Sequence, residues 1–391
     1  LKNLGLLAYF KYANFFVAEI NSFLLGWEFS PIEWHGVILP IGISFFTFQK
    51  ISYIIDVYRG KSRALVNIVD FALYIAMFPQ LIAGPIVRFS YIRRQLKERR
   101  ESWNDFYNGT LRFCWGLLKK VVIAGSCAQI ADVIFGLQLE LLDTKVAWLG
   151  AITYTLQIYF DFSAYSDMAI GMGMMFGFTF PENFNRPYSA LSITDFWRRW
   201  HITLSRWFRD YLYSPLGGNR RTTFRTCLNM AIVCILCGIW HGANWTFLVW
   251  GIYHGVFLIL ERVTGTREIS HEKFKILRRF ITLLIVVIGW VLFRSENITQ
   301  ATGFLGAMFT LTDGPISYEL SRALNYRNLL ILMTALPVFF LPRDFSLIRQ
   351  LIDKKDPAPL FAGVVMILLV LPYCAALIVG GASSPFIYYR F

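Results

Sequence analysis

Gly238-Ile-Trp-His241-Gly-Ala-Asn-Trp245 stands between two apolar runs. The runs extend from Cys227 to Trp240 and from Trp245 to Leu260, and only a short Gly-Ala-Asn turn separates them. Two apolar segments joined so closely are typical of neighbouring helices in a membrane. The sequence therefore predicts an all-α, polytopic integral membrane protein.

The composition of the chain supports the same fold class. Of its 391 residues, 56% are hydrophobic and 17% aromatic, and the mean hydropathy is +0.48. Only 16% of the residues are charged, against about 25% in an average soluble domain. A membrane β-barrel would show alternating segments of about ten residues, and the sequence has no such pattern.

Further apolar segments predict additional membrane helices within one membrane domain, residues 1–391. The segment from Ile68 to Val87 contains Phe78-Pro-Gln-Leu-Ile-Ala-Gly-Pro85, whose prolines and glycine break a helix, so we expect a re-entrant hairpin there. The chain starts at Leu1 without a signal peptide, and we expect it to lack N-terminal spans. The other predicted segments are Leu4–Leu25, Val37–Ile55, Phe106–Phe135, Val146–Phe178, Phe280–Leu292, Leu329–Leu341 and Pro359–Val379.

The net charge of +13 is concentrated in the loops. Six basic residues lie between Arg262 and Arg279 and four between Arg343 and Lys355, whereas the stretch from Ser295 to Arg327 is less basic. The positive-inside rule places the two basic loops in the cytoplasm and the tail, residues 380–391, outside it. We expect anionic lipid headgroups and a membrane-facing partner as counter-charges, and no nucleic acid.

A second polar stretch, Asp195-Phe-Trp-Arg-Arg-Trp-His201, lies in a predicted amphipathic helix. Ser192 is its expected N-cap, with Asp195 at the third helical position. At helical spacing one face is aromatic and apolar, and the opposite face is basic. The aromatic face is formed by Phe196, Trp200, Leu204, Trp207 and Tyr211, and the basic face by Arg198, Arg206 and Arg209.

Histidines and aspartates in apolar surroundings are the candidate functional residues, because ionisable groups at membrane depth are costly. His201 and His241 are the first candidates, although each is also compatible with a structural role. For His254 we expect a helix–helix hydrogen bond. Asp161 and Asp167 are either proton-relay groups or buried carboxylates with hydrogen-bonding partners, such as Ser163, Tyr165 or an arginine of the central segment.

Metal binding is not predicted. The sequence has no His-Glu-x-x-His motif, and His241 and His254 have no acidic partner at helical spacing. A zinc site needs three or four ligands.

Taken together, the motifs resemble the membrane-bound O-acyltransferase superfamily. More narrowly, they are similar to the bacterial branch that includes the alginate O-acetyltransferase membrane subunit and the teichoic-acid D-alanyl transfer subunit. The matching stretches are Pro40–Phe48, Phe78–Pro85, Asp161–Asp167, Asn183–Tyr188, Phe196–His201 and Trp240–Trp245.

The resemblance implies a ring of tilted helices, with re-entrant and amphipathic helices, around a central tunnel. It further implies a multi-pass protein of the bacterial inner membrane that moves an acyl group from a cytoplasmic thioester to an acceptor outside. The essential histidine corresponds to His241 and the second histidine to His201. Acetyl-CoA is the implied donor substrate, and no cofactor is expected.

The C-terminal sequence Phe386-Ile-Tyr388-Tyr-Arg-Phe391 resembles a motif of envelope acylation systems. By this resemblance Tyr388 carries the acyl group before a secreted or membrane-anchored SGNH-hydrolase-like acyltransferase passes it to a polysaccharide. An aromatic interface anchor is the alternative.

For the reaction we expect His241 to act as general base, since an imidazole with a pKa of about 6.5 accepts a proton at neutral pH. An oxyanion would be stabilised by His201, Asn185 or an arginine, Arg198 or Arg199. Trp240, Asn244 and Asp161 complete the predicted substrate-binding residues.

Two other functions fit part of the sequence. A proton-coupled polymer or lipid transporter would use Asp161 and Asp167, and His241 would be dispensable. A structural membrane scaffold would use the basic loops, and changes at His201 and His241 would be silent. Counting spans from the basic loops also places His241 near the outer end of its span, whereas the thioester donor is expected in the cytoplasm. Either the turn after His241 is buried in the middle of the membrane, or a deep funnel on the inner side thins the barrier between donor and histidine.

Overall fold

The computed structural model describes residues 2–266, 274–342, 345 and 357–381, and all regular elements in this part of the chain are helical. The prediction of an all-α protein is confirmed. The elements in chain order are α1 (Lys2–Gly26), α2 (Ile43–Tyr58), α3 (Ile68–Ala76), α4 (Phe78–Leu81), α5 (Phe89–Ile92), α6 (Gln95–Glu98), α7 (Trp103–Leu118), η1 (Lys119–Ala124), α8 (Gly125–Phe135), η2 (Leu139–Leu141), α9 (Thr144–Met175), η3 (Pro187–Ser189), α10 (Ile193–Arg199), α11 (Ile202–Phe208), η4 (Arg209–Tyr213), α12 (Thr223–His241), α13 (Trp245–Val263), α14 (Lys275–Arg294), α15 (Ile298–Phe309), α16 (Tyr318–Ala323), α17 (Tyr326–Ala335), η6 (Leu336–Phe339) and α19 (Pro357–Val379).

Four helices of the described chain are long and apolar enough to cross a bilayer: α12, α13, α14 and the Leu360–Val379 part of α19. They agree with four of the predicted membrane segments. Helices α15 and α16 were not predicted, since they lie in the polar stretch between Ser295 and Arg327.

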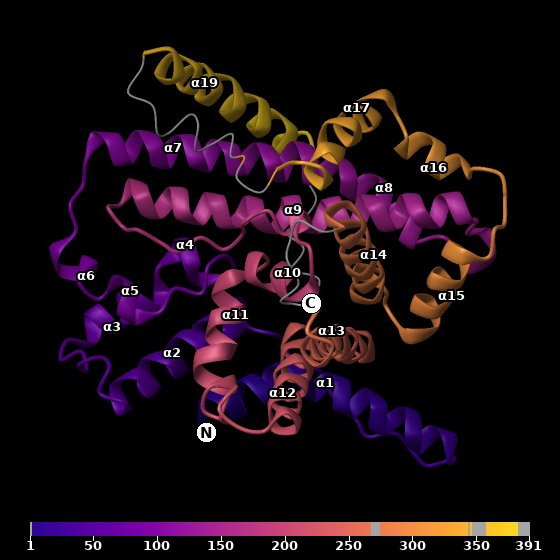
Figure 1. Ribbon diagram of the computed structural model, residues 1–391, viewed down its shortest axis with the longest axis horizontal. Helices are drawn as coiled ribbons and strands as arrows, with labels where there is room; N and C mark the ends of the chain where they lie inside the picture. Colours follow the sequence, from indigo (N-terminus) through magenta and orange to yellow (C-terminus); the bar gives the residue numbers. More distant parts are fainter. Residues whose placement is uncertain (1, 267–273, 343–344, 346–356, 382–391) are drawn as a thin grey trace.

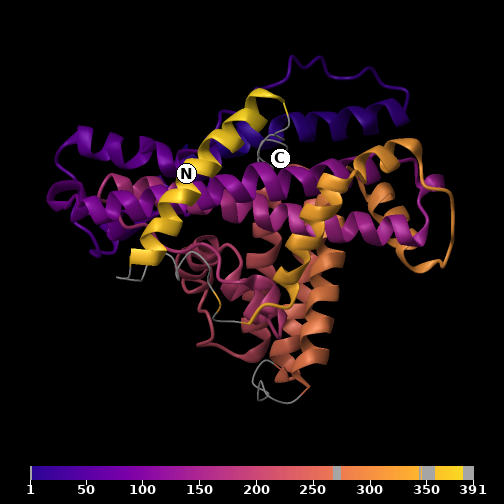
Figure 2. The same ribbon diagram turned by 90° about the horizontal axis from the view of Figure 1, so that it is seen from above.

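Helix α9 is the centre of the molecule, and α7 lies along it for most of its length (Figures 1 and 2). Small residues allow this close packing. A Cβ added to Gly109 of α7 would lie 2.6 Å from the carbonyl oxygen of Gly171 in α9. A Cβ at Gly116 would likewise lie 2.7 Å from the carbonyl oxygen of Ala164. Such close backbone approach is characteristic of helix packing in membranes.

A π-helical turn, η1, joins α7 to α8 and carries two lysines that pair with α9. The Lys119 ammonium lies 2.6 Å from Asp167, and the Lys120 ammonium lies 2.6 Å from Asp161. Arg112 also pairs with Asp167, at 2.9 Å. The expectation that these aspartates have buried partners is confirmed. These charged partners come from α7 and η1, whereas the sequence suggested an arginine of the central segment.

Helices α12 and α13 form the hairpin that the sequence predicts, and they run crosswise to α9 (Figures 1 and 2). Glycines bring the two helices together. A Cβ at Gly238 would lie 2.4 Å from the carbonyl oxygen of Phe247, and a Cβ at Gly251 would lie 2.5 Å from that of Cys234.

The segment from Ile68 to Val87 does not form one helix, which confirms the predicted break. Helix α3 ends at Ala76, and α4 is a single turn. The irregular backbone is buried in protein, where Tyr74 donates a hydrogen bond to the Val87 carbonyl at 3.2 Å and Gln80 donates one to the Tyr74 carbonyl at 2.8 Å. Gly84 has φ +95°, a conformation that favours glycine.

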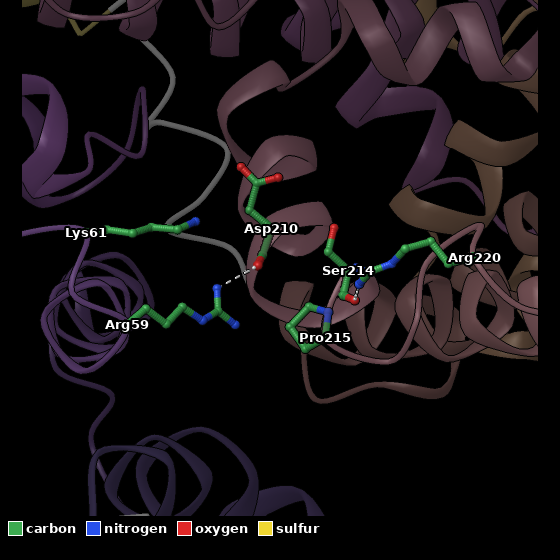
Figure 3. A pocket seen from close by; sticks show the side chains of 6 residues that line it. All are labelled: Arg59, Lys61, Asp210, Ser214, Pro215 and Arg220. Carbon is green, nitrogen blue, oxygen red and sulfur yellow. Dashed lines mark hydrogen bonds between the residues drawn. The ribbon is translucent and has the colours of Figure 1, made fainter.

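A second π-helical turn, η4, follows α11 and is held by arginines from other parts of the chain. Arg59 donates a hydrogen bond to the carbonyl oxygen of Asp210 at 3.2 Å, and Arg220 donates one to that of Ser214 at 3.1 Å (Figure 3). The carboxylate of Asp210 pairs with Arg88 at 2.7 Å. These contacts fix the end of the central segment against the region that follows α2.

Three sequence predictions fall wholly or partly outside the described residues. They are the basic loop between Arg343 and Lys355, part of the basic loop between Arg262 and Arg279, and the C-terminal tail with Tyr388. The orientation of the helices, the tunnel and the division into a single membrane domain stay predictions.

Candidate active site

His241 is the last residue of α12, and Gly242 and Asn244 shape the turn after it. Gly242 has no room for a side chain, because an added Cβ would lie 2.1 Å from the ring of Phe247. Asn244 accepts a hydrogen bond from the backbone N–H of Thr246 at 3.0 Å and so caps α13. Its amide also donates to the Glu296 carbonyl at 2.6 Å. Asn244, predicted to bind substrate, thus holds the turn in place.

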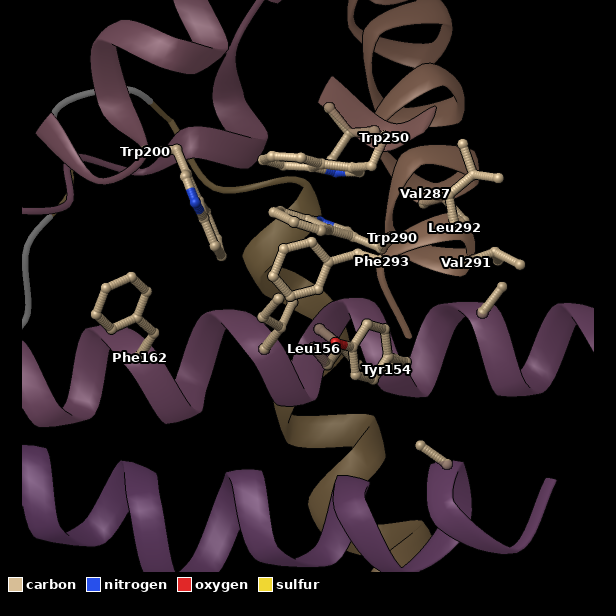
Figure 4. Packing of buried hydrophobic residues seen from close by; sticks show 14 of the residues in the cluster. Tyr154, Leu156, Phe162, Trp200, Trp250, Val287, Trp290, Val291, Leu292 and Phe293 are labelled. Atoms are coloured by element: carbon tan, nitrogen blue, oxygen red, sulfur yellow. The ribbon is translucent and has the colours of Figure 1, made fainter. Parts of the chain in front are cut away.

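The His241 imidazole is buried among aromatic rings from α12, α13 and α14. Its ring centroid lies 5.0 Å from that of Trp240, 5.1 Å from that of Trp250 and 5.2 Å from that of Phe293. Figure 4 shows Trp250, Trp290 and Phe293 gathered between these helices and α9. His241 is only 5% exposed.

Helix α1 binds the end of α12 that carries His241. The Lys11 ammonium donates hydrogen bonds to the carbonyl oxygens of Trp240 and His241, the latter at 3.1 Å. The Tyr12 hydroxyl donates to the carbonyl oxygen of Ile239 at 2.8 Å. A helix leaves its last carbonyls without intrahelical partners, and a cation suits that end of the helix dipole. The sequence showed Lys11 only as a charge within an apolar run.

His201 lies at a break in the central segment, and the predicted continuous helix is wrong at this point. Helix α10 ends at Arg199, α11 begins at Ile202, and His201 has φ +42°. The extended segment before α10 forms hydrogen bonds with the backbone groups that the break leaves without helical partners. The Asn183 carbonyl accepts a hydrogen bond from the Ile202 N–H at 2.9 Å, and the Asn185 N–H donates one to the Arg199 carbonyl at 2.9 Å.

The two faces of the central segment are nevertheless as predicted. All five residues of the aromatic face are buried, and the three arginines of the basic face are exposed. Ser192 caps α10 by accepting from the Asp195 N–H at 3.0 Å. The two faces are kept across the break because α11 places its apolar and basic residues on the same sides as α10.

Asn183 fixes the orientation of His201 and was not among the predicted site residues. Its side-chain oxygen accepts hydrogen bonds from the Thr203 hydroxyl at 2.8 Å and from the Thr203 backbone N–H at 3.3 Å, and lies 3.0 Å from His201 Nδ1. A backbone N–H can only donate, so this side of the amide is the oxygen. Nδ1 of His201 must therefore carry the proton. In the neutral imidazole, Nε2 is then a hydrogen-bond acceptor.

Several buried polar atoms around the two histidines have no hydrogen-bond partner among the described residues. They include Nε2 of His201 and the indole nitrogens of Trp197, Trp240 and Trp250. Buried polar atoms in folded proteins nearly always have a partner, protein or water. This concentration of open donors and one acceptor fits a site that receives a polar ligand.

His254 of α13 does not form the predicted helix–helix hydrogen bond. Both ring nitrogens lack a partner within the described chain. The ring fits into a notch in α14, where a Cβ at Gly289 would lie 2.7 Å from Nε2. Its centroid lies 5.2 Å from that of Trp250, so His254 belongs to the same aromatic cluster.

A cavity of about 550 Å³ opens beside the central segment. Trp197 at the cavity wall contacts Trp250, with ring centroids 5.5 Å apart, and Trp250 contacts His241. Two successive tryptophan side chains therefore lie between the cavity and the histidine. No carboxylate is among the described residues that line it, which are Thr194, Trp197, Arg198, Ile202, Ser205, Arg206, Arg209, Tyr213, Asn219, Met230, Leu258 and Arg262.

The remaining predicted site residues lie in different places. Arg198 lines the cavity, whereas Arg199 pairs with Asp195 at 2.9 Å. The Asn185 side chain is exposed. Asp161 pairs with Lys120, as described above, and Tyr388 lies outside the described residues. No group of three or more His, Cys, Asp or Glu side chains suited to a metal ion occurs in the described chain; the absence of a metal stays a prediction.

Comparison with known proteins gives consistent matches. Residues 61–299 match the family described as MBOAT, membrane-bound O-acyltransferase family. The chain is 45% identical over 405 residues to the probable alginate O-acetylase AlgI of Pseudomonas putida, covering 100% of this chain and 82% of the relative. It is 49% identical over 359 residues to the probable alginate O-acetylase AlgI of Pseudomonas aeruginosa, covering 91% and 68%. It is also 40% identical over 357 residues to the peptidoglycan O-acetyltransferase of Helicobacter pylori, covering 84% and 67%.

Proposed function

The chain belongs to the membrane-bound O-acyltransferase family, and from that premise we propose that it transfers an acetyl group from acetyl-CoA to a hydroxyl for O-acetylation of an exported polysaccharide. It is a multi-pass membrane protein and an O-acyltransferase. The names of the relatives make alginate the first polysaccharide to test, with peptidoglycan next. The bacterial inner membrane is the proposed location.

The observation that carries the proposal is the arginine-lined cavity and its link to His241. Four arginines and no described carboxylate line it, which suits the phosphates of a coenzyme A thioester. Three of the arginines belong to the basic face, and Arg262 begins a basic loop predicted to be cytoplasmic, so the donor would enter from the cytoplasmic side. Trp197 and Trp250 then mark the path of the thioester toward His241. This arrangement supports a deep inner funnel.

In the proposed reaction, His241 accepts the proton of the acceptor hydroxyl while that oxygen attacks the thioester carbonyl carbon. The tetrahedral intermediate collapses with cleavage of the carbon–sulfur bond, and the thiolate takes the proton from His241. The products are the acetyl ester and free coenzyme A, and His241 returns to its starting form.

The polar atoms without partners suggest the other roles. Trp240 and Trp250 both contact His241, and each has a buried indole N–H without a described partner. These two donors are suited to stabilise the oxyanion. His201, with a proton on Nδ1, presents the Nε2 lone pair and would accept a hydrogen bond from an N–H or O–H group of the substrates other than the reacting hydroxyl, whose proton goes to His241.

Tyr388 is the proposed first acceptor, on the sequence motif alone. A phenol with a pKa of about 10 is a better leaving group in a second transfer than a sugar hydroxyl. The second transfer would be made by a secreted or membrane-anchored hydrolase-like acyltransferase. This partner and the relay are inferences from the resemblance.

The test is an incubation of the purified protein in nanodiscs with radiolabelled acetyl-CoA, followed by mass spectrometry of the label. We expect an acetyl ester on Tyr388 and a loss of transfer of roughly 10²- to 10⁴-fold in His241→Ala. His35→Ala removes an exposed histidine and is the matched control. Unchanged transfer in a folded His241→Ala protein would refute the general-base role.

A label that is absent from Tyr388 but present on added acceptor would refute the relay and leave the transferase function intact. An absence of donor binding to the folded wild-type protein would refute acetyl-CoA as the donor.

A further inference from the structure

A second basic cavity, of about 330 Å³, lies next to the arginine-lined cavity proposed above for the acetyl-CoA donor. The neighbouring residues Arg209 and Asp210 of η4 line the two cavities, Arg209 the first and Asp210 the second. The proposed reaction does not use the second cavity. Figure 3 shows its lining, which consists of Arg59, Lys61, Asp210, Ser214, Pro215 and Arg220.

Three cationic side chains line this cavity and keep hydrogen-bond donors available. Arg59 and Arg220 each donate one hydrogen bond to a backbone carbonyl, which positions the guanidinium group. A guanidinium has five N–H donors, so most of them remain for a ligand. The Lys61 ammonium makes no hydrogen bond or ion pair with any described residue.

The only described carboxylate in the lining, Asp210, is already neutralised by other arginines. One of its oxygens lies 2.7 Å from Arg88 and the other lies 2.7 Å from Arg209. Burial opposes ionisation of Asp210, but the arginines outweigh it and lower the pKa of the carboxyl group. Asp56, the nearest acid on α2, is buried and accepts a hydrogen bond from Tyr211 at 2.7 Å. The positive charge of the cavity is therefore uncompensated.

Exposed apolar side chains lie close to Arg59 and Lys61 in the sequence. Tyr58 precedes Arg59 and is 90% exposed, and Val66 and Ile68 follow Lys61 and are 102% and 79% exposed. Large apolar side chains with so much exposure are stable beside hydrocarbon rather than water. A ligand at this place would meet cations with one end and an apolar surface with the other.

We propose that this cavity binds the phosphate of an anionic phospholipid, with the acyl chains along the exposed apolar side chains between α2 and α3. Guanidinium groups suit phosphate because their N–H donors match two phosphate oxygens at once. The cavity adjoins the one that Arg262 lines, so the predicted orientation puts it on the cytoplasmic side, where anionic headgroups attract lysine and arginine. The apolar flank favours a lipid over free phosphate as the source of the phosphate.

Native mass spectrometry of the full chain in detergent, titrated with phosphatidylglycerol, tests this site. The double variant Arg59→Gln/Arg220→Gln removes two exposed cations from the lining. We expect it to weaken the tightest-bound phosphatidylglycerol roughly 25-fold, since each cation near a lipid surface contributes about five-fold. Arg93→Gln/Arg94→Gln removes the same charge from exposed residues outside the cavity and should leave binding within about two-fold.

Two further titrations distinguish the sources of the phosphate. Phosphatidylethanolamine, whose ammonium opposes the cations, should bind more weakly than phosphatidylglycerol, and excess inorganic phosphate should displace little of the bound lipid. Equal weakening in both double variants would overturn the proposal, because a diffuse surface charge would then explain binding. Complete displacement by inorganic phosphate would overturn the lipid assignment. Neither result depends on acetyl transfer.

Discussion

His201 is the residue whose chemistry depends most on a single neighbour. Its Nδ1 contacts the Asn183 oxygen, and that oxygen is identified by the Thr203 backbone N–H. The Asn183 amide also donates to the Ser166 hydroxyl at 3.0 Å, which links the site to α9. One amide thus sets the tautomer of His201 and its position relative to Trp240, whose ring centroid is 6.4 Å away.

At the residue scale, we predict that Asn183→Ala lowers both stability and transfer. The change leaves the buried Nδ1–H of His201 and the Thr203 hydroxyl without their acceptor, at a cost of roughly 1–3 kcal/mol. Released from Asn183, His201 can adopt the other tautomer, and we expect the transfer rate to fall about tenfold or more. Thermal unfolding in detergent and acetyl transfer with saturating donor measure the two effects.

The matched control is Asn185→Ala, two residues along the same segment. Its side chain is exposed, and the hydrogen bonds that hold it to Arg199 involve its backbone. We expect a change in stability within about 0.5 kcal/mol. Equal losses in the two variants would show that the segment, and not the Asn183 amide, matters for His201.

The sequence predicts His241 as a candidate site residue, but it does not indicate which residues contact the two histidines. His241 stands out because it follows an apolar run and is flanked by glycine and tryptophan. In the sequence Asn183 is an ordinary turn residue, and Lys11 is a single charge in an apolar helix. The roles of both residues depend on contacts with distant parts of the chain. The break at His201 was also hidden, because both halves of the segment keep helical spacing.

At the scale of elements, the contact between α1 and α12 is the least expected. The last carbonyls of α12 receive their donors from Lys11 and Tyr12, and Lys11 also lies 5.6 Å from the centre of the Trp240 ring. The position of His241 therefore depends on a helix that supplies none of the aromatic rings around its imidazole.

We predict that Lys11→Met lowers the stability by roughly 2 kcal/mol, because two buried carbonyls lose their donor and the cation at the helix C-terminus is lost. A shift of His241 should lower the transfer rate about tenfold. Lys11→Arg retains a cation and should recover part of the rate. Lys2→Met, at an exposed position of the same helix, is the control, and a loss of activity there would contradict this account.

The hairpin of α12 and α13 gives a second prediction for an element. Gly251→Ala places a methyl group against the Cys234 carbonyl oxygen, 2.5 Å away, and against Gly238. We expect a loss of about 1–3 kcal/mol through overpacking, seen as a lower unfolding temperature.

Gly306→Ala in α15 is the matched control, since nothing lies within 4 Å of the added methyl group. Alanine is favoured over glycine in a helix, so this variant should be stabilised by about 0.5–1 kcal/mol. A similar loss in both variants would mean that close packing at Gly251 is not the cause.

For the molecule as a whole, the buried ion pairs between η1 and α9 decide between two functions. A proton-coupled transporter would need Asp161 and Asp167 to gain and lose protons. Each aspartate instead lies 2.6 Å from a lysine ammonium, with side-chain exposures of 3% for Asp161 and 15% for Asp167. Such pairs stabilise the ionised carboxylates and fix the register of the central helices.

We predict that Asp161→Asn is destabilised by about 3–5 kcal/mol, because the Lys120 ammonium then remains buried without its counter-charge. The double variant Asp161→Asn/Lys120→Met should regain most of the stability and of the transfer rate. Unfolding temperature and acetyl transfer are the measurements. A stable but inactive double variant would instead favour a functional role for the carboxylate.

The positions of the four long apolar helices and the broken segment at residues 68–87 were predictable, because hydropathy, proline and glycine act locally. The pairing of Lys119 and Lys120 with α9 was not, although both lysines and both aspartates were visible as charges in apolar runs. Which charge meets which depends on how the helices pack, and a one-residue change in helical phase would redirect each side chain.

The hydrogen bonds from α1 to the end of α12 also have a consequence for the order of folding during synthesis. Lys11 and Trp240 are 229 residues apart, so during synthesis Lys11 leaves the ribosome well before its carbonyl partners exist. At about 5–20 residues per second the delay is roughly 10–50 s. Over that interval the charged helix α1 exists without its final partner. The end of α12 that carries His241 thus receives its donors from a helix synthesised more than two hundred residues earlier.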